Sequence, residues 1–356
     1  MQAAINFLVR IGCCAVVGVG ALFVLALPAK AGPVAAQGPV VLPAVEPKHV
    51  DLGISEWLLR MHEASRKGAY IGTIVVSSGA NMSSARIWHV CDGDLQMERV
   101  ESLSGTPRST FRRNDQVITF LPDSKTAVTE KRESLGLFPD LLKSADSSIA
   151  QFYAARQTGS ERVAGYDADV VVLQPKDSLR FGYRVWSEKK SGLVVKLQTL
   201  DVDGRVLEQA AFSELQLDAP VNIGKLTQMM DNTDGYRVER PELVKTSAAA
   251  EGWTMKNPVP GFTPMSCYKR PAAVSDGAIS QGTMQWIFSD GLASVSLFLE
   301  VFDRRRHAQE GSIALGATHT LTRRVSDKTG EWWLTVVGEV PRATLGAFSL
   351  GLERRK

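Results

Sequence analysis

The side chains that could carry out chemistry are few and widely spaced in this 356-residue chain. Histidine is the commonest metal ligand and general base in proteins, yet the five histidines show no ligand spacing: His49, His62, His89, His307 and His319. We expect His62 on the solvated side of a helix and His89 as a structural residue of a strand. The sequence therefore predicts no metal site and no cofactor.

Other reactive motifs are missing as well. Asp201-Val202-Asp203-Gly204 resembles the start of a calcium loop, but its fifth position is Arg205 and its twelfth is Phe212, where a carboxylate should sit. We interpret it as a turn. The chain also lacks a G-x-S-x-G motif, a phosphate-binding glycine loop and H-E-x-x-H. The sequence favours a binding protein over an enzyme, and an unrecognised envelope hydrolase stays open as an alternative.

The N-terminus is typical of an exported protein. Residues 1–31 fit a secretory signal peptide, with Arg10, an apolar core at Ile11–Leu27 and a cleavage site at Ala29-Lys30-Ala31. The apolar run is too short to favour a permanent membrane span. Residues 32–50, rich in Pro, Ala and Val, predict a flexible leader. We therefore expect a periplasmic or secreted protein of about 320 residues, a length that suits two domains.

Two cysteines, Cys91 and Cys267, follow the predicted signal peptide. An oxidising compartment makes a disulfide between them one interpretation, and it would tie the two halves of the chain together. Two separate buried thiols are the equally weighted alternative, because spacing alone does not show whether the sulfurs meet.

The net charge of +3 comes entirely from the C-terminal part of the chain. Residues 251–356 hold 13 Lys and Arg against 10 Asp and Glu, whereas residues 1–250 are balanced. This surplus is too weak for nucleic acid but suits an acidic peptide or an anionic lipid head group. The predicted partner-binding residues are Arg304, Arg305, Arg323, Arg324 and Trp332.

The first large region, residues 51–232, predicts an open antiparallel sheet with covering helices. Apolar residues recur at helical spacing from Ile54 to Ala64. Strands separated by turn signals are expected at 70–77, 85–90, 95–103, 109–113 and 117–120, and again at 162–165, 168–174, 180–186, 193–201 and 205–217. Between these two runs, residues 133–156 predict short helices.

A polar linker is expected at residues 233–251, followed by a smaller α+β domain at residues 252–356. Its predicted hairpins are 283–288 with 293–302 and 318–325 with 331–337, and residues 341–352 predict a closing helix. The overall expectation is an α+β protein, with an incomplete barrel in its first domain.

A helix-covered curved sheet can enclose an apolar cavity that suits a lipid or an apolar peptide. Each large apolar residue taken alone is more often plain core. The cluster Leu135–Leu142 is the best candidate for a mobile lid, because Gly136 and Pro139 interrupt it. The predicted cavity residues are Trp88, Met97, Phe120, Phe138, Leu141, Leu142, Phe152, Phe181 and Tyr183.

Several passages, taken in order, resemble one protein family. They are Trp57–Met61 leading to Tyr70–Thr73, Glu98–Gly105 leading to Arg112-Arg113, Gly165-Tyr166, Phe181–Trp186, Pro258–Phe262 and Val336–Pro341. Together these passages resemble the RseB/MucB family, negative regulators of the sigma-E (AlgU-type) envelope stress response. The resemblance covers essentially the whole chain after the predicted signal peptide.

The resemblance implies a first domain shaped like the lipoprotein carriers LolA and LolB, and a periplasmic binding function. The partner would be the periplasmic region of a membrane anti-sigma factor of the RseA or MucA type, shielded from site-1 proteolysis. Mislocalised lipoprotein, through its acyl chains, or lipopolysaccharide would act as the release signal, and a homodimer is compatible with this view. The alternative is a lipid or lipoprotein carrier, against which the second domain argues.

Overall fold

The computed structural model describes residues 53–131, 149–270, 273–275, 278–280, 282–307, 309–328 and 330–354. The predicted signal peptide, the predicted leader and three predicted cavity residues, Phe138, Leu141 and Leu142, lie outside this part of the chain. Within it, every helix is too short or too polar to cross a membrane.

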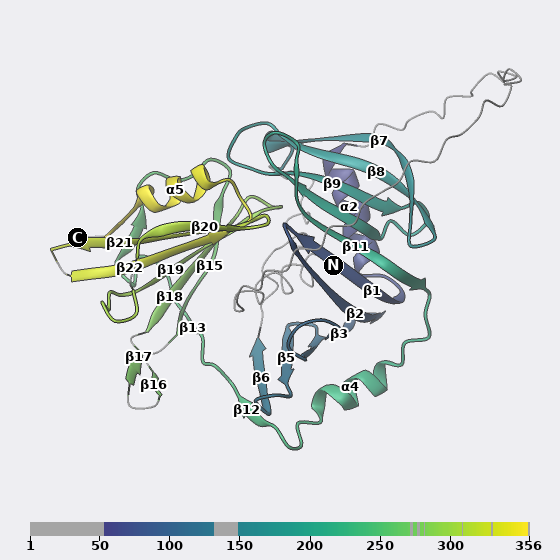
Figure 1. Cartoon of the computed structure of the whole chain (residues 1–356), viewed down its shortest axis with the longest axis horizontal. Coiled ribbons are helices and arrows are strands. Elements are labelled where there is room, and N and C mark those ends of the chain that lie inside the picture. The colour runs from purple at the N-terminus through teal and green to yellow at the C-terminus, as the bar shows by residue number, and fades with distance from the viewer. Residues whose placement is uncertain are drawn as a thin grey trace, which may run out of the picture.

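The first domain is built on one large, curved, almost entirely antiparallel sheet (Figure 1). Its order within the described residues is β12-β6-β5-β4-β3-β2-β1-β11-β10-β9-β8-β7. The strands are β1 (Ala69–Ser78), β2 (Asn81–Asp92), β3 (Leu95–Ser102), β4 (Ser109–Arg113), β5 (Gln116–Leu121), β6 (Thr126–Lys131), β7 (Tyr153–Val163), β8 (Tyr166–Pro175), β9 (Gly182–Glu188), β10 (Val194–Leu200), β11 (Val206–Leu217) and β12 (Arg237–Glu239). Apart from the β12–β6 and β1–β11 pairs, strands that are neighbours in the sheet are also consecutive in the chain. The β1–β11 pair joins the two meanders.

Helix α2 (Ile54–Ser65) covers one face of this sheet. Its apolar residues recur every three or four positions, which puts Trp57, Leu58 and Met61 on a single buried stripe. That stripe packs into a core with Ile74, Ile87 and other residues of β1, β2 and β8–β11. The helical prediction for this segment is confirmed.

The opposite face of the sheet is covered by α4 (Ile223–Asp231). Asn222 caps this helix by accepting a hydrogen bond from the Lys225 amide at 2.8 Å. Leu226 and Met230 then pack against an apolar patch on β3–β6 that includes Met97. Both faces of the sheet are therefore occupied by core, because successive strand residues point to opposite sides.

The second domain is a seven-stranded antiparallel sheet with one helix on it. Its order within the described residues is β13-β15-β18-β19-β22-β21-β20. The strands are β13 (Val244–Lys245), β15 (Thr263–Arg270), β18 (Thr283–Ser289), β19 (Ser294–Val301), β20 (Gly311–Leu315), β21 (Thr318–Asp327) and β22 (Gly330–Gly338). Helix α5 (Arg342–Gly351) packs on β21 and β22 through Leu345 and Phe348, which are fully buried.

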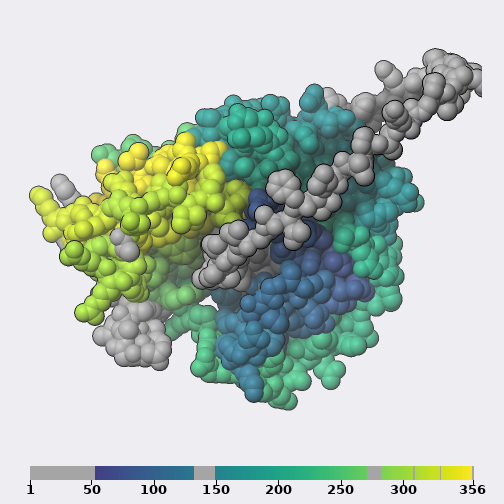
Figure 2. Space-filling model, in the orientation of Figure 1, coloured from purple at the N-terminus to yellow at the C-terminus, as the bar shows by residue number. Residues whose placement is uncertain are grey.

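Two small ribbons complete the second domain. Strand β14 (Trp253–Met255) pairs with β23 (Leu352–Arg354), which brings the end of the domain back to its beginning. Strand β16 (Ala273–Ser275) pairs with β17 (Ala278–Ser280) as a separate hairpin. In the space-filling view, the second domain abuts the β7–β11 part of the first sheet directly (Figure 2).

The predicted fold class is confirmed: an open antiparallel sheet with covering helices, joined to a smaller α+β domain. The sequence prediction was wrong between residues 153 and 156, because helix α3 spans only Ile149–Phe152 and the chain then continues as β7. The physical reason is long-range pairing: β7 runs in register with β8 from Tyr153 to Val163, and these ladder bonds outweigh local helix propensity.

Candidate functional site: the junction between the domains

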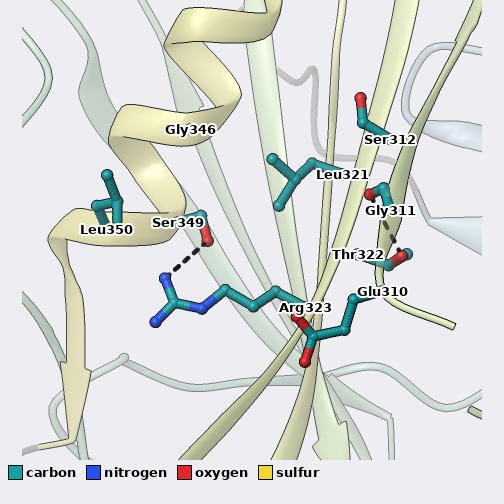
Figure 3. Close-up of a pocket in the computed structure, with 9 residues that line it drawn as sticks. All are labelled: Glu310, Gly311, Ser312, Leu321, Thr322, Arg323, Gly346, Ser349 and Leu350. Carbon is teal, nitrogen blue, oxygen red and sulfur yellow. Dashed lines mark hydrogen bonds between the residues drawn. The ribbon is translucent and has the colours of Figure 1, made fainter.

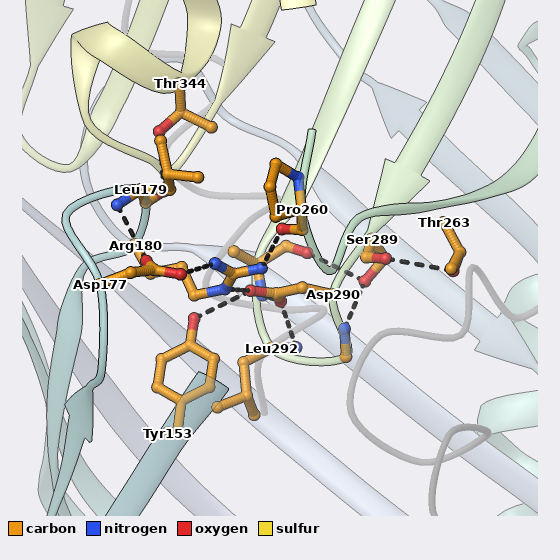
Figure 4. A network of polar contacts seen from close by, with 12 residues as sticks. Tyr153, Asp177, Leu179, Arg180, Pro260, Thr263, Ser289, Asp290, Leu292 and Thr344 are labelled. Atoms are coloured by element: carbon orange, nitrogen blue, oxygen red, sulfur yellow. Dashed lines mark hydrogen bonds and ion pairs between the residues drawn. The ribbon is translucent and has the colours of Figure 1, made fainter. Parts of the chain in front are cut away.

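A fully buried arginine lies at the centre of the contact between the two domains (Figure 4). Arg180 belongs to the loop between β8 and β9, and each of its guanidinium nitrogens donates a hydrogen bond. Nε reaches Asp290 Oδ2 at 2.6 Å, Nη2 reaches the Pro260 carbonyl at 2.6 Å and Nη1 reaches Asp177 Oδ2 at 2.5 Å. Asp290 and Pro260 belong to the second domain, so one side chain ties both domains together.

Aromatic rings from both domains pack against the guanidinium. The Arg180 guanidinium carbon lies 4.2 Å from the Phe152 ring centroid and 4.9 Å from that of Phe262, one ring from each domain. Gly261 allows this approach, because a Cβ there would lie 2.2 Å from Arg180 Nη2 and its φ is +79°. The site is therefore buried and closely packed.

The acidic partner is equally well satisfied. The Asp290 side chain is fully buried in the β18–β19 turn, where Oδ1 accepts from the Leu292 and Ala293 amides at 2.9 and 2.7 Å. The Tyr153 hydroxyl donates to Oδ2 at 3.1 Å. Burial, and then the Asp290 charge, raise the pKa of Tyr153 well above its usual value, so this donor keeps its proton.

A further hydrogen bond holds the same loop from α5. The hydroxyl of Thr344, in the first turn of that helix, donates to the Leu179 carbonyl at 2.7 Å. Residues 177–180 are thus held by three separate segments of the second domain. We call Tyr153, Asp177, Arg180, Pro260 and Asp290 the latch.

The β20–β21 hairpin makes a second contact with the first domain. A Cβ on Gly316 at its turn would lie 1.9 Å from Ser78 Oγ and 3.2 Å from Glu208 Oε2. Ser78 and Glu208 face each other in the β1–β11 ladder. Nearby, His319 of β21 makes an edge contact with Phe181, with ring centroids 5.6 Å apart.

Two ionisable groups at this hairpin contact are perturbed. Burial, and then the neighbouring Glu339 charge, raise the pKa of Glu208 from 4.5 to about 7. Burial, and then the Arg342 charge, lower the pKa of His319 below its usual 6.5. Both groups therefore favour their neutral forms when the domains are docked.

The structure does not bring the six described cavity residues together. Met97 and Phe120 lie under α4, and Trp88 is on the same face, with the Arg99 guanidinium 4.7 Å from its ring. Tyr183 packs on the α2 face and is buried. Phe152 and Phe181 belong to the junction with the second domain.

This separation follows from strand geometry. A strand has a two-residue period, so Trp88 points away from its buried neighbours Ile87 and His89. The sequence shows which residues are apolar but not which face of a two-sided sheet each one takes. The role of these residues in lipid binding stays a prediction.

The predicted partner-binding residues occupy two faces of the second sheet. Arg304 and Arg305 are exposed in the turn after β19. Arg324 is exposed, pairs with Glu331 and lies with its guanidinium carbon 4.4 Å from the Phe302 ring centroid. Arg323, its neighbour on β21, points to the opposite face, as does Trp332 in the register of β21 with β22.

Trp332 packs against other residues of the second domain. Its ring packs edge-on against Trp253 with centroids 5.6 Å apart, and the Arg354 guanidinium carbon lies 4.4 Å from it. Arg323 faces a shallow hollow of about 460 Å³ between α5 and the β20–β21 edge, where its Nη1 lies 3.5 Å from Ser349 Oγ (Figure 3). The hollow is lined by Glu310, Gly311, Ser312, Leu321, Thr322, Arg323, Gly346, Ser349 and Leu350.

Both cysteines are free thiols in this structure, so the disulfide interpretation is not realised in it. Cys267 is buried in the core of the second domain, whereas Cys91 lies on β2 with its sulfur 3.3 Å from His89 Nε2. Burial raises the pKa of each thiol. In this structure the latch, and not a disulfide, connects the two domains. The described residues contain no cluster of three metal-ligating side chains.

Sequence reasoning missed the charged pair at the centre of the junction, Arg180 and Asp290. The sequence places Arg180 in the expected strand 180–186 and Asp290 in the turn between the expected strands 283–288 and 293–302. They lie 110 positions apart, and nothing local to either one indicates the other. The one local sign that Arg180 could be buried is its apolar neighbour Phe181.

The fold and junction define a class of protein: two sheet domains held as one unit by a buried polar contact, with broad exposed surfaces outside it. The model of the MucB/RseB N-terminal domain matches residues 53–230, and that of the MucB/RseB C-terminal domain matches residues 247–353. The chain belongs to the MucB/RseB family.

Individual relatives agree over most of the chain. The sigma factor AlgU regulatory protein MucB of Pseudomonas aeruginosa is 28% identical over 84% of this chain and 90% of its own length. The sigma-E factor regulatory protein RseB of Escherichia coli K12 is 22% identical over 81% of this chain and 86% of its own. A crystal structure of MucB in complex with MucA(peri) matches at a TM-score of 0.64 and 26% identity, covering 85% of this chain and 99% of that one.

Proposed function

We propose that this protein is a regulatory binding protein that holds the periplasmic region of a MucA- or RseA-like anti-sigma factor. One observation carries the proposal: both domains together match MucB as it is seen in complex with MucA(peri), over nearly the whole length of that MucB chain. A second MucA/MucB complex from Pseudomonas aeruginosa matches at a TM-score of 0.65. Binding requires no chemistry, in agreement with the lack of reactive motifs.

The latch supports this function physically. A partner segment that touches both domains loses less binding free energy when the domains are already held in one arrangement. Arg180 and Asp290 supply that preorganisation without using the outer faces of either sheet. The exposed basic residues Arg304, Arg305 and Arg324 are our proposed contacts for acidic side chains of the partner, since exposed charges steer association.

The proposal extends to location and regulation. The protein would act in the periplasm after removal of residues 1–31, shield the anti-sigma factor from site-1 proteolysis, and release it on binding acyl chains or lipopolysaccharide. Release of this kind requires the signal to bind the free form more tightly than the complexed form. The six described cavity residues lie on different faces of the sheet and at the domain junction, so their role in sensing acyl chains stays a prediction.

Calorimetric titration tests the proposal. The protein, as residues 32–356, is titrated with the periplasmic segment of its own organism's anti-sigma factor, and one-to-one binding is expected. Arg304→Glu with Arg305→Glu should weaken binding at least tenfold, whereas Arg156→Glu, an exposed arginine on β7, should not. A lack of wild-type binding, with an acylated lipopeptide still bound, would replace the regulator by a lipid carrier.

A further inference from the structure

Within the described residues, the contact of the β20–β21 hairpin with the first domain encloses a carboxyl group that has no lysine or arginine in an ion pair with it. Glu208 is only 5% exposed, and within the described residues it forms no ion pair with lysine or arginine. The polar groups that contact its carboxyl are neutral, the Ser78 hydroxyl and the Ala317 amide. A carboxyl group in such surroundings favours its neutral form, because burial removes the water that stabilises the charge.

The second domain itself contributes to this burial. The Gly316 turn approaches so closely that a Cβ would lie 3.2 Å from Glu208 Oε2, and the Ala317 amide donates to the same carboxyl group. If the hairpin moved away, water would reach Glu208. The protonation state of Glu208 and the docking of the hairpin are therefore thermodynamically linked.

Other charged and titratable groups surround this contact from several elements. Glu339, just after β22, adds a like charge. Tyr183 on β9 stays neutral, because burial and then Glu339 raise its pKa well above the usual value. On β21, His319 lies near Arg342, and the Arg180–Asp290 pair is further into the junction. None of the ion pairs among the described residues neutralises Glu208.

We propose that Glu208 makes docking of the β20–β21 hairpin onto the first domain pH-dependent, with the hairpin docked when this carboxyl is protonated and loosened when it ionises. This inference concerns the chain alone and does not depend on the anti-sigma partner. The latch holds the domains together throughout, so the motion is confined to the hairpin side of the junction.

The direction follows from the pKa of Glu208, raised from 4.5 to about 7 in the docked state. A carboxyl group whose pKa is raised by docking stabilises the docked state fully below pH 4.5. This stabilisation is lost as the pH rises through about 7. Between pH 6 and pH 8 the docking equilibrium should weaken about tenfold. His319 has a lowered pKa and acts in the opposite sense, opposing docking only as the pH falls below 6.5.

Hydrogen exchange at the hairpin turn tests the proposal. The protection factors of the Gly316 and Ala317 amides are measured in the whole protein from pH 6 to pH 8, after correction for the intrinsic rate. Wild-type protection should fall about tenfold over this range. Glu208→Gln should show protection that does not change over this range, and Glu214→Gln, an exposed residue of the same strand, should follow the wild type.

A second variant keeps the test decisive even if Glu208→Gln does not fold. Glu339→Gln removes the like charge that helps to raise the pKa of Glu208, so the midpoint of the protection change should move to lower pH. Equal pH dependence in Glu208→Gln and the wild type would overturn the proposal. So would flat wild-type protection, or an unchanged midpoint in Glu339→Gln.

Discussion

The two contacts between the domains treat buried charge in opposite ways. In the latch, each guanidinium nitrogen of Arg180 has an acceptor and Asp290 has three donors besides. At the hairpin, Glu208 is buried beside another carboxylate, Glu339, and within the described residues it forms no ion pair with lysine or arginine. A buried charge with an opposite charge beside it fixes geometry, whereas a buried carboxyl group without one responds to pH.

The largest effect is expected from breaking the latch. Asp290→Ala leaves Arg180 charged and buried, so the free energy of unfolding should fall by about 3–5 kcal/mol. Urea unfolding followed by tryptophan fluorescence measures this loss. As a control, Arg205→Ala removes an exposed ion pair with Asp201 and should leave the unfolding curve nearly unchanged. Equal effects of the two variants would contradict the role of the latch.

A smaller loss is expected at the glycine that lets the latch close. Gly261→Ala places a methyl group 2.2 Å from Arg180 Nη2 at a φ of +79°, and should cost about 2–3 kcal/mol. Gly204→Ala is the matched control, with the same φ of +79° and open space around it. It should cost about 1 kcal/mol from backbone strain alone. The difference between the two variants isolates close packing at the latch.

The hairpin contact should respond to pH where the latch does not. With a raised pKa of about 7, Glu208 loses its stabilising contribution as the pH rises through that value. Glu208→Gln should therefore be more stable than the wild type by about 2–3 kcal/mol at pH 8 and equal to it below pH 4.5, where the carboxyl is protonated in both states. Thermal unfolding at the two pH values measures this. A constant difference at both would indicate a packing effect instead of a titration.

The smallest effect is expected at the edge of the latch. Thr344→Val keeps the shape of the side chain but removes the hydrogen bond to the Leu179 carbonyl, at a cost of about 1 kcal/mol. Thr335→Val, on the half-buried face of β22, serves as a comparison and should change stability less. Chemical unfolding under the conditions used for Asp290→Ala places both on one scale.

Local patterns predicted the elements of this fold well. The helical recurrence of Trp57, Leu58 and Met61 identified both α2 and its buried stripe. Turn signals such as Asp203-Gly204 placed the β10–β11 hairpin. These features depend on neighbours in sequence, which is why the pattern alone is sufficient.

The candidate site could not be derived in the same way. The pairing of Arg180 with Asp290 spans 110 residues, and the burial of Glu208 depends on a hairpin more than 100 residues later. The predicted cavity includes both Trp88 and Tyr183, where strands and covering helices were expected to face each other, yet these two residues lie on opposite faces of one sheet. Long-range pairing and the choice of sheet face are properties of the folded chain.

The central claim is that this protein shields an anti-sigma factor from proteolysis, and protection from cleavage tests it most directly. The periplasmic region of the anti-sigma factor is incubated with its site-1 protease, with and without a saturating amount of this protein. The account predicts that cleavage slows in proportion to the complex formed and recovers when an acylated lipopeptide is added. An unchanged cleavage rate at saturation would contradict it.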